Sequence, residues 1–420
     1  MTTTRRSRKH VVAFVWDERS LSTLLEAGDL QVTVVLDAWE SQNRDMKPAI
    51  LDKIRALHVV TSYTDLTSLA ALGVRLRAET PAVQAVISLG EYSQLGAAYL
   101  ASVIGLPEPS IATSVLVRDK SAMKAAARRG GIPCAKQQVL YDRDEAALET
   151  MGADLGWPVV IKPIHGMGTV DTWVVDSARQ AAELLCGVSS DTTIVVEEYI
   201  DGDEYHVDAV WVDSKPVDFG IGRYAIPRIQ ITDPGHLNGS AHLREAEHRE
   251  LYDALRPLSI AVNAAMGITS GITHAEFFHT PDGRWIFSEI ATRPGGAGTT
   301  KVFGFFGDDL RVRWLTSVFA DPARVCREEP VYAAFGWANF APSRVGRVTA
   351  APDEAILRKF PFVEDVIVGH QAGDVMREVH PSTWSWLVFF GADSFEEYVD
   401  RLLEVEKVAL FSVEDERPVV

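Results

Sequence analysis

Short apolar runs alternate with helical patterns over about the first 110 residues of the chain. The runs at residues 11–16, 31–36, 59–61 and 85–89 are rich in β-branched side chains, which suits strands buried on both faces of a parallel sheet. Strands that alternate with helices predict a doubly wound α/β domain, which we place at residues 1–112. The first run is not followed by a GxGxxG motif, which argues against a dinucleotide site.

The middle of the chain mixes strands and helices in another order. A helix at 119–130 begins with a capping aspartate and ends in a glycine pair. Apolar strands follow at 159–163 and 193–200, and a long amphipathic helix is expected at 245–266. Beyond residue 303 the pattern is weaker. It still predicts a helix at 308–319, short alternating strands and a final helix with a solvated charged face.

From His274 the sequence reads HAEFFHTPDGRWIFSEIATRPGGAG, in which a Pro-Asp-Gly turn separates two apolar runs and predicts a β-hairpin. Glu276 and Glu289 lie in the two runs and would meet across the paired strands. Like charges repel there unless a cation neutralises them, and paired carboxylates suit Mg²⁺. Arg293 and a glycine turn follow, as phosphoryl transfer requires. The alternative is a hairpin with solvated glutamates.

Two lysines occupy unusual positions. Lys120 lies in the first turn of its helix, where a cation opposes the helix dipole, and Lys162 lies within an apolar strand, where an unpaired charge is costly. Gly166, Gly168 and Thr169 follow that strand and would offer backbone N–H groups to phosphate oxygens. The order of residues is not that of a Walker A loop, and a simple hairpin would fit the same pattern.

Acidic residues mark several strand ends. Glu91 follows a strand and would either meet a substrate at the carboxyl edge of the sheet or favour the start of the next helix. Glu197 and Glu198 end the strand at 193–200, where backbone groups can bond an adenine edge, and Glu204 could accept both ribose hydroxyls. A plain β-hairpin with polar ends is the alternative here.

Composition and charge narrow the classes of function. The 420 residues carry a net charge of −17, which argues against a nucleic-acid partner but says little about a small anionic substrate. Three widely spaced cysteines match no metal site and cannot all pair, which predicts a reducing cytoplasmic location. The apolar run after the basic N-terminus is too short for a signal peptide or membrane span, so no membrane partner is expected.

The combined motifs RDKSAMK, GIP, VIKPIHGMGT, VVEEYIDGDEYHVD and AEFF…WIFSEIATRPGG resemble the ATP-grasp superfamily of carboxylate–amine ligases, most strongly from 116 to 298. The resemblance implies an N-terminal α/β domain, an ATP-grasp lid at 113–202 and a central α+β domain at 203–420. It also implies a small C-terminal antiparallel lobe from about residue 330. ATP and Mg²⁺ are the implied cofactors, with Mn²⁺ as a substitute.

The resemblance assigns roles position by position. Lys120 and Lys162 match the lysines that hold the ATP phosphates, and the glycine loop closes over them. Glu289 and Glu276 match the Mg²⁺ ligands, and Arg293 matches the arginine that faces the transferred phosphoryl group. Glu197 matches the acid that accepts from the adenine amino group, and Glu204 matches the acid that binds the ribose. Tyr199 and Ile200 match the linker whose backbone contacts the base, and Glu198 beside them is also expected to bind the nucleotide.

One position departs from many members of the superfamily. They carry an asparagine two residues after the second glutamate as a further metal ligand, where this chain has Ala291. Water and phosphate oxygens can complete the coordination, because Mg²⁺ keeps several waters. The departure weakens the likeness to peptidoglycan-type and glutathione-type ligases. The EIAxRPGG form is more similar to amino-acid ligases that make dipeptides.

The implied reaction transfers the γ-phosphoryl group of ATP to a carboxylate and lets an amine attack the acyl-phosphate, which gives an amide. The expected substrates are a small carboxylate and a small amine, both amino acids. In the polar segment 220–242, Arg223 or Arg228 would bind a second carboxylate. His236 would donate a hydrogen bond to the tetrahedral oxyanion or accept the proton of the amine. The alternative is an ordinary polar loop.

Three further expectations stay open. Another ATP-grasp reaction, such as bicarbonate activation or a purine-pathway ligation, would use much the same residues. A nucleotide-binding module without catalysis is a third reading. Ligases of this superfamily are often homodimers, which makes a homodimer one expectation for this chain.

Overall fold

The computed structural model describes residues 9–15, 17–26, 30–44, 46–319, 322–380 and 382–415. Trp16, the end of the first predicted strand, lies outside them. Within the described ranges no helix combines the length and apolarity needed to cross a membrane. The three cysteines are free thiols.

The N-terminal sheet is parallel, with the strand order β3-β2-β1-β4. Val11 and Val12 of β1 point to opposite faces, and helices cover both: α1 lies on one face, and α4 and α5 lie on the other. The predicted doubly wound domain is therefore confirmed. Its elements are β1 (Lys9–Phe14), α1 (Glu18–Glu26), β2 (Leu30–Asp37), α2 (Ala38–Asn43), α3 (Pro48–Leu51), β3 (Ala56–Val60), α4 (Leu66–Arg77), β4 (Val83–Ser88), α5 (Gln94–Ile104) and α6 (Ile111–Arg118).

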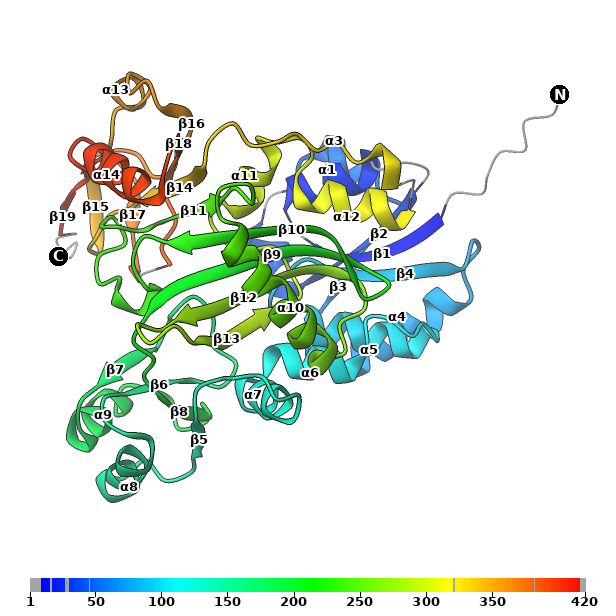
Figure 1. The fold of residues 1–420 in the computed structure, drawn as a ribbon. Coiled ribbons are helices and arrows are strands. Elements are labelled where there is room, and N and C mark those ends of the chain that lie inside the picture. The colour runs from blue at the N-terminus through cyan, green and yellow to red at the C-terminus, as the bar shows by residue number, and fades with distance from the viewer. Residues whose placement is uncertain are drawn as a thin grey trace, which may run out of the picture.

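A second, smaller unit forms the lid, which extends away from the rest of the molecule in Figure 1. Its antiparallel sheet has the order β5-β8-β6-β7 and a core of its own beneath two helices. The helix that precedes it, α7 (Lys120–Arg129), is capped by Asp119, which accepts a hydrogen bond from the backbone of Ala122 at 2.8 Å. The lid elements are β5 (Gln137–Leu140), α8 (Glu145–Leu155), β6 (Val159–Pro163), β7 (Trp173–Val175), α9 (Ala178–Leu185) and β8 (Ile194–Glu198).

The central sheet has eight strands in the order β13-β12-β9-β10-β11-β14-β18-β16, and its strands pair antiparallel. The predicted hairpin is confirmed as β12 and β13. The elements are β9 (Asp203–Val212), β10 (Lys215–Tyr224), η1 (Arg228–Gln230), β11 (Gly239–Leu243), α10 (Arg249–Met266), β12 (Gly271–His279), β13 (Trp285–Ala291), α11 (Thr299–Gly304), α12 (Leu310–Phe319), η2 (Pro322–Arg324), β14 (Ala334–Phe340), β16 (Val363–Ile367) and β18 (Trp386–Ala392).

The C-terminal strands pair antiparallel, as expected, and three of them continue the central sheet. Strands β14, β18 and β16 extend the central sheet, because β14 pairs with β11 over the full length of β11. Only β15 (Gly346–Ala350), β17 (Val375–Met376) and β19 (Ser412–Glu414) form a small sheet of their own. The helix α13 (Glu354–Leu357) precedes β16, and α14 (Phe395–Glu406) packs its apolar side against β14 and β18.

Strands β8 and β9 do not form the plain hairpin that was the alternative reading of this segment. Strand β8 lies in the lid sheet and β9 in the central sheet. Residues 199–202 therefore connect two layers of the molecule, and the acidic end of β8 faces the space between them.

The packing of α14 can be tested by truncating Leu402, which is fully buried on its apolar side. Leu402→Ala should lower the free energy of unfolding in urea by about 2–5 kcal/mol, because it removes buried contacts and leaves a cavity. Glu404→Ala, on the exposed side of the same helix, should change it by no more than about 0.5 kcal/mol. Equal losses in both variants would mean that α14 is not packed as described.

Candidate functional site

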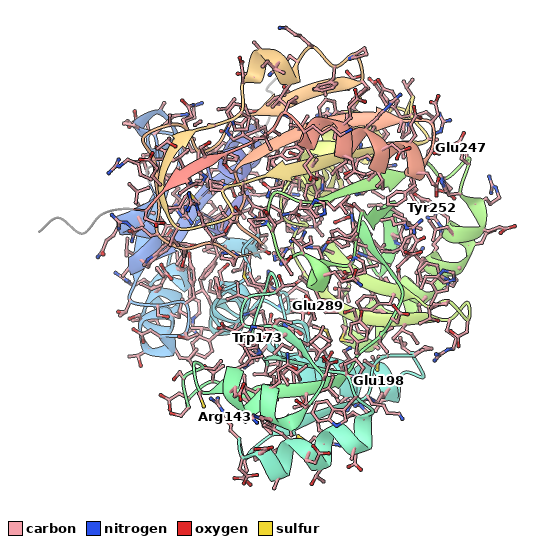
Figure 2. All side chains as sticks on the ribbon, turned by 90° about the vertical axis from the view of Figure 1, so that its left-hand side faces the viewer. Arg143, Trp173, Glu198, Glu247, Tyr252 and Glu289 are labelled. Carbon is pink, nitrogen blue, oxygen red and sulfur yellow. The ribbon has the colours of Figure 1, made fainter. Side chains whose placement is uncertain are left out.

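A cavity of about 960 Å³, open to solvent, lies between the lid sheet and the central sheet. Figure 2 shows Glu289 near the junction of the two units, with Trp173 and Glu198 on the side of the lid. Thirteen of the sixteen predicted site residues line this cavity, and they are Lys120, Lys162, Gly166, Gly168, Thr169, Glu197, Glu198, Tyr199, Ile200, Glu204, Arg228, Glu276 and Glu289.

The two predicted metal ligands face one another in the hairpin. Glu276 and Glu289 are direct partners in the β12–β13 register, which places their side chains on the same side of the sheet. Tyr224 donates a hydrogen bond to Glu276 Oε1 at 3.0 Å. Burial would raise the pKa of Glu276, but contacts with His274 and Tyr224 lower it to about 2. Contacts within the protein thus favour the charged form of Glu276, which is the form that binds a cation.

The predicted phosphate lysines are buried beside these acids. Lys120 Nζ lies 3.5 Å from Glu289 Oε2 and donates to the carbonyl of Gly166 at 2.5 Å. Its position at the start of α7 points it into the cavity, which explains a cation in that first turn. Burial lowers the pKa of Lys120, while Glu289 opposes the change.

Lys162 is held by Glu197, with 2.8 Å between Nζ and Oε2. Lys124 reaches the same oxygen at 3.5 Å. Burial would raise the pKa of Glu197, but the two lysines hold it below its ordinary value. Glu197 Oε1 is buried and has no hydrogen-bond partner among the described residues. An unsatisfied buried acceptor at this place fits a ligand that brings an N–H group.

The end of the cavity at residues 198–204 combines a linker with a buried acid. Glu198 Oε2 accepts from the backbone N–H of Lys136 at 3.1 Å, and Tyr199 and Ile200 line the cavity directly after it. Glu204 accepts from the backbone N–H of Arg228 at 2.6 Å. Burial, followed by the charge of Glu276, raises the pKa of Glu204 to about 8.

The glycine loop between β6 and β7 reaches across to the C-terminal part of the chain. Ser382 donates a hydrogen bond to the carbonyl of Gly168 at 2.6 Å, and Arg228 donates to the same hydroxyl at 3.4 Å. Gly168 and Thr169 both have positive φ, 62° and 59°. The loop thus covers one side of the cavity and is fastened by a residue outside the lid.

Arg293 lies beside the cavity and not in its lining. Its guanidinium donates to Glu91 and to the carbonyl of Pro294, and burial lowers its pKa against the charges of Glu289 and Glu276. Arg118 pairs with the other oxygen of Glu91. Glu91 therefore bridges two arginines, so it does more than favour the start of a helix.

The three residues predicted from the polar segment separate in space. Arg228 lines the cavity, bonds Asn238 Oδ1 at 2.6 Å and stacks on Trp384. Arg223 lines a different cavity, where it pairs with Asp203 at 2.7 Å. His236 lies at the surface, 2.7 Å from Glu406. Neither Arg223 nor His236 is brought to the central cavity.

Sequence reasoning missed several residues at the site. Lys124 is 2% exposed and lies one helical turn after Lys120, so its i, i+4 spacing in KSAMK was an available signal. Polar residues at alternate positions of β9 and β12, in EYHVD and THAE, were a second signal. They form a buried cluster of His206, Asp208 and His274 behind Glu276.

The residues present fit a magnesium nucleotide. Two facing carboxylates supply oxygen ligands for Mg²⁺, and Lys120 and Lys162 supply positive charge for phosphates. Apolar side chains including Val160, Phe278 and Ile286 line the same cavity and would pack against a flat base.

Comparison with known proteins shows a likeness in sequence and in fold. Residues 155–301 match the family model of the ATP-grasp domain. The structure of this chain superposes on the crystal structure of an L-amino acid ligase from Bacillus licheniformis with a TM-score of 0.73 at 18% sequence identity. The superposition covers 98% of this chain and 100% of that one. The chain has the ATP-grasp fold, and the predicted resemblance to that superfamily is confirmed.

Two relatives found by sequence differ in how much of this chain they match. The L-arginine-specific L-amino acid ligase of Bacillus subtilis is 25% identical over 364 residues, which are 84% of this chain and 85% of that protein. A D-alanine–D-alanine ligase of Corynebacterium jeikeium is 28% identical, but over only 52% of this chain and 57% of its own length. The extent of the first match agrees with the predicted likeness to amino-acid ligases.

The metal assignment can be tested by Glu289→Gln, which removes one carboxylate charge but keeps the shape of the side chain. ADP release should be abolished, because Mg²⁺ loses a ligand and the phosphates lose their counter-charge. Far-UV circular dichroism and the thermal midpoint serve as controls for the fold. Unchanged turnover in this variant would contradict the assignment.

The separation of the two arginines gives a second test. Arg228→Ala should slow ADP release by at least about tenfold, since a charge-assisted hydrogen bond contributes about 1.5–3 kcal/mol. Arg223→Ala, in the other cavity, and His236→Ala, at the surface, should leave it within about twofold, as is usual for substitutions away from a site. Equal losses in Arg223→Ala and Arg228→Ala would place the substrate elsewhere.

Proposed function

We propose that this chain is an ATP-dependent carboxylate–amine ligase that joins two amino acids, or an amino acid and an amine, through an acyl-phosphate. The observation that carries the proposal is the cavity itself, in which facing carboxylates, buried lysines and the glycine loop surround one space. The relatives named as amino acid ligases support the class of reaction, and the match to the L-arginine-specific L-amino acid ligase covers most of both chains.

The roles follow from the positions of the side chains. Lys120 and Lys162 neutralise the phosphates, and Glu276 and Glu289 hold the metal. When bound, Mg²⁺ and ATP supply the activated phosphoryl group. Arg293, fixed by Glu91 beside the cavity, faces the negative charge that develops on the transferred group.

The nucleotide end of the cavity uses different groups. Glu197 Oε1 accepts from the amino group of the base, and the backbone of Tyr199 and Ile200 contacts its edge. Glu204 accepts from the ribose hydroxyls. Of these groups, Glu197 has a buried oxygen without a hydrogen-bond partner in the described part of the chain, which supports its assignment.

Arg228 and the glycine loop are the parts of the cavity lining to which we assign substrate binding and the exclusion of water. Arg228 binds the carboxylate of an amino-acid substrate, because its guanidinium is oriented by Asn238 and Trp384 within the lining. The glycine loop, fastened at Gly168 by Ser382, shields the acyl-phosphate from hydrolysis. A homodimer stays a prediction.

The alternative is another ATP-grasp reaction. An N5-carboxyaminoimidazole ribonucleotide synthetase from Thermotoga maritima shares the fold with a TM-score of 0.67 at 16% identity. A likeness at this identity concerns the fold alone. Such an enzyme would use one defined metabolite, whereas the proposed ligase requires a carboxylate and an amine together.

The proposal is tested by ADP release over pairs of amino acids with Mg²⁺-ATP, followed by mass spectrometry of the products. We expect ADP release that needs both partners and a product lighter than their sum by one water. Full turnover with no amine present, or incorporation of bicarbonate, would favour the alternative reactions.

A further inference from the structure

Asp208 is fully buried in β9 and is the centre of a polar cluster behind the cavity. Its Oδ1 accepts from His274 Nδ1 at 2.9 Å, and its Oδ2 accepts from His206 Nδ1 at 2.6 Å. His242 Nε2 lies 3.4 Å from Oδ2 but makes no hydrogen bond with the described residues. A buried carboxylate is costly unless such donors surround it, and here two histidines supply them.

The cluster leads directly to a proposed metal ligand. His274 Nε2 lies 3.4 Å from Glu276 Oε1, and Tyr224 O–H donates to the same oxygen. The strand register explains this, because Asp208 pairs with His274 and His206 pairs with Glu276 on adjacent strands.

Two glycines make room for the cluster. A Cβ atom on Gly222 of β10 would lie 2.2 Å from His206 Nε2, and one on Gly295 would lie 2.7 Å from His274 Nδ1 and 3.0 Å from Asp208 Oδ1. Gly295 belongs to the turn that follows Arg293. The turn beside Arg293 therefore packs directly against the cluster.

We propose that Asp208 is a positioning residue for the metal: through His274 it fixes the Glu276 carboxylate in the orientation that Mg²⁺ requires. Partners of this kind orient a ligand and are worth about 10–100-fold in metal affinity. The atoms of His206, Asp208 and His274 lie within 4.8 Å of one another and could themselves hold a metal. They already bond one another, however, which favours support of Glu276 over a second metal site.

The inference rests on the proposed function for the metal role of Glu276 and for the identity of the bound nucleotide, and it is tested by binding. Free Mn²⁺ is measured by electron paramagnetic resonance with and without a non-hydrolysable ATP analogue, and only the analogue-dependent binding is counted. Asp208→Asn keeps the shape but can accept from only one histidine. It should weaken this binding about 10–100-fold.

Thr273→Val is the matched control. Thr273 is 1% exposed on the opposite side of β12 and accepts a hydrogen bond from Trp211 at 2.8 Å, so its loss disturbs the same strands without touching the cluster. Its Mn²⁺ affinity should equal that of the wild type. Equal weakening in Thr273→Val and Asp208→Asn would overturn the proposal, since general loosening of the sheet would explain both.

A second variant covers a failure of Asp208→Asn to fold. His274→Gln cuts the same connection next to Glu276 and should also weaken analogue-dependent Mn²⁺ binding, together with a rise in the Mg²⁺ concentration that gives half-maximal ADP release. Wild-type Mn²⁺ affinity in His274→Gln would sink the proposal. A wild-type protein that binds Mn²⁺ and the analogue but releases no ADP would instead contradict the proposed function alone.

Discussion

Burial of several carboxylates around one space is the constraint on which the site depends. Glu276, Glu289, Glu197 and Glu204 all border the same cavity, and their mutual repulsion must be offset by cations. Within the described chain, lysines offset part of it: Glu197 takes two, and Glu289 takes Lys120. Glu276 relies on His274 and Tyr224, and Glu204 responds with a raised pKa. A divalent cation would neutralise the negative charge that these contacts leave on the carboxylates.

The two groups of charge come from different layers of the fold. The hairpin that carries Glu276 and Glu289 belongs to the eight-stranded sheet, whereas Lys162 and Glu197 belong to the lid sheet. Neither layer holds a complete site. The full set of charges therefore surrounds one space because the lid lies against the central sheet.

The features of the site that depend on residues close together in the sequence could be predicted. The turn and the apolar runs of the hairpin determined the pairing of Glu276 with Glu289, and the motifs around Lys120 and Lys162 placed both in the cavity. Long-range pairing was not readable. Arg223 and Tyr224 are neighbours, yet strand alternation sends only Tyr224 towards Glu276. The extension of the central sheet depends on β11 and β14 pairing across about 90 residues, for which no local pattern exists.

The short connection between β8 and β9 is also part of the cavity wall, since Tyr199 and Ile200 lie in it. The other connection of the lid is fastened where Phe287 donates its backbone N–H to Pro133 at 2.8 Å. The lid is therefore joined to the central sheet at both of its ends, through residues 199–202 and through the bond between Pro133 and Phe287. A base seated against Tyr199 and Ile200 would restrict the backbone torsions of this connection, so the proposed adenine site and the chain segment that joins the lid to the central sheet are one structure.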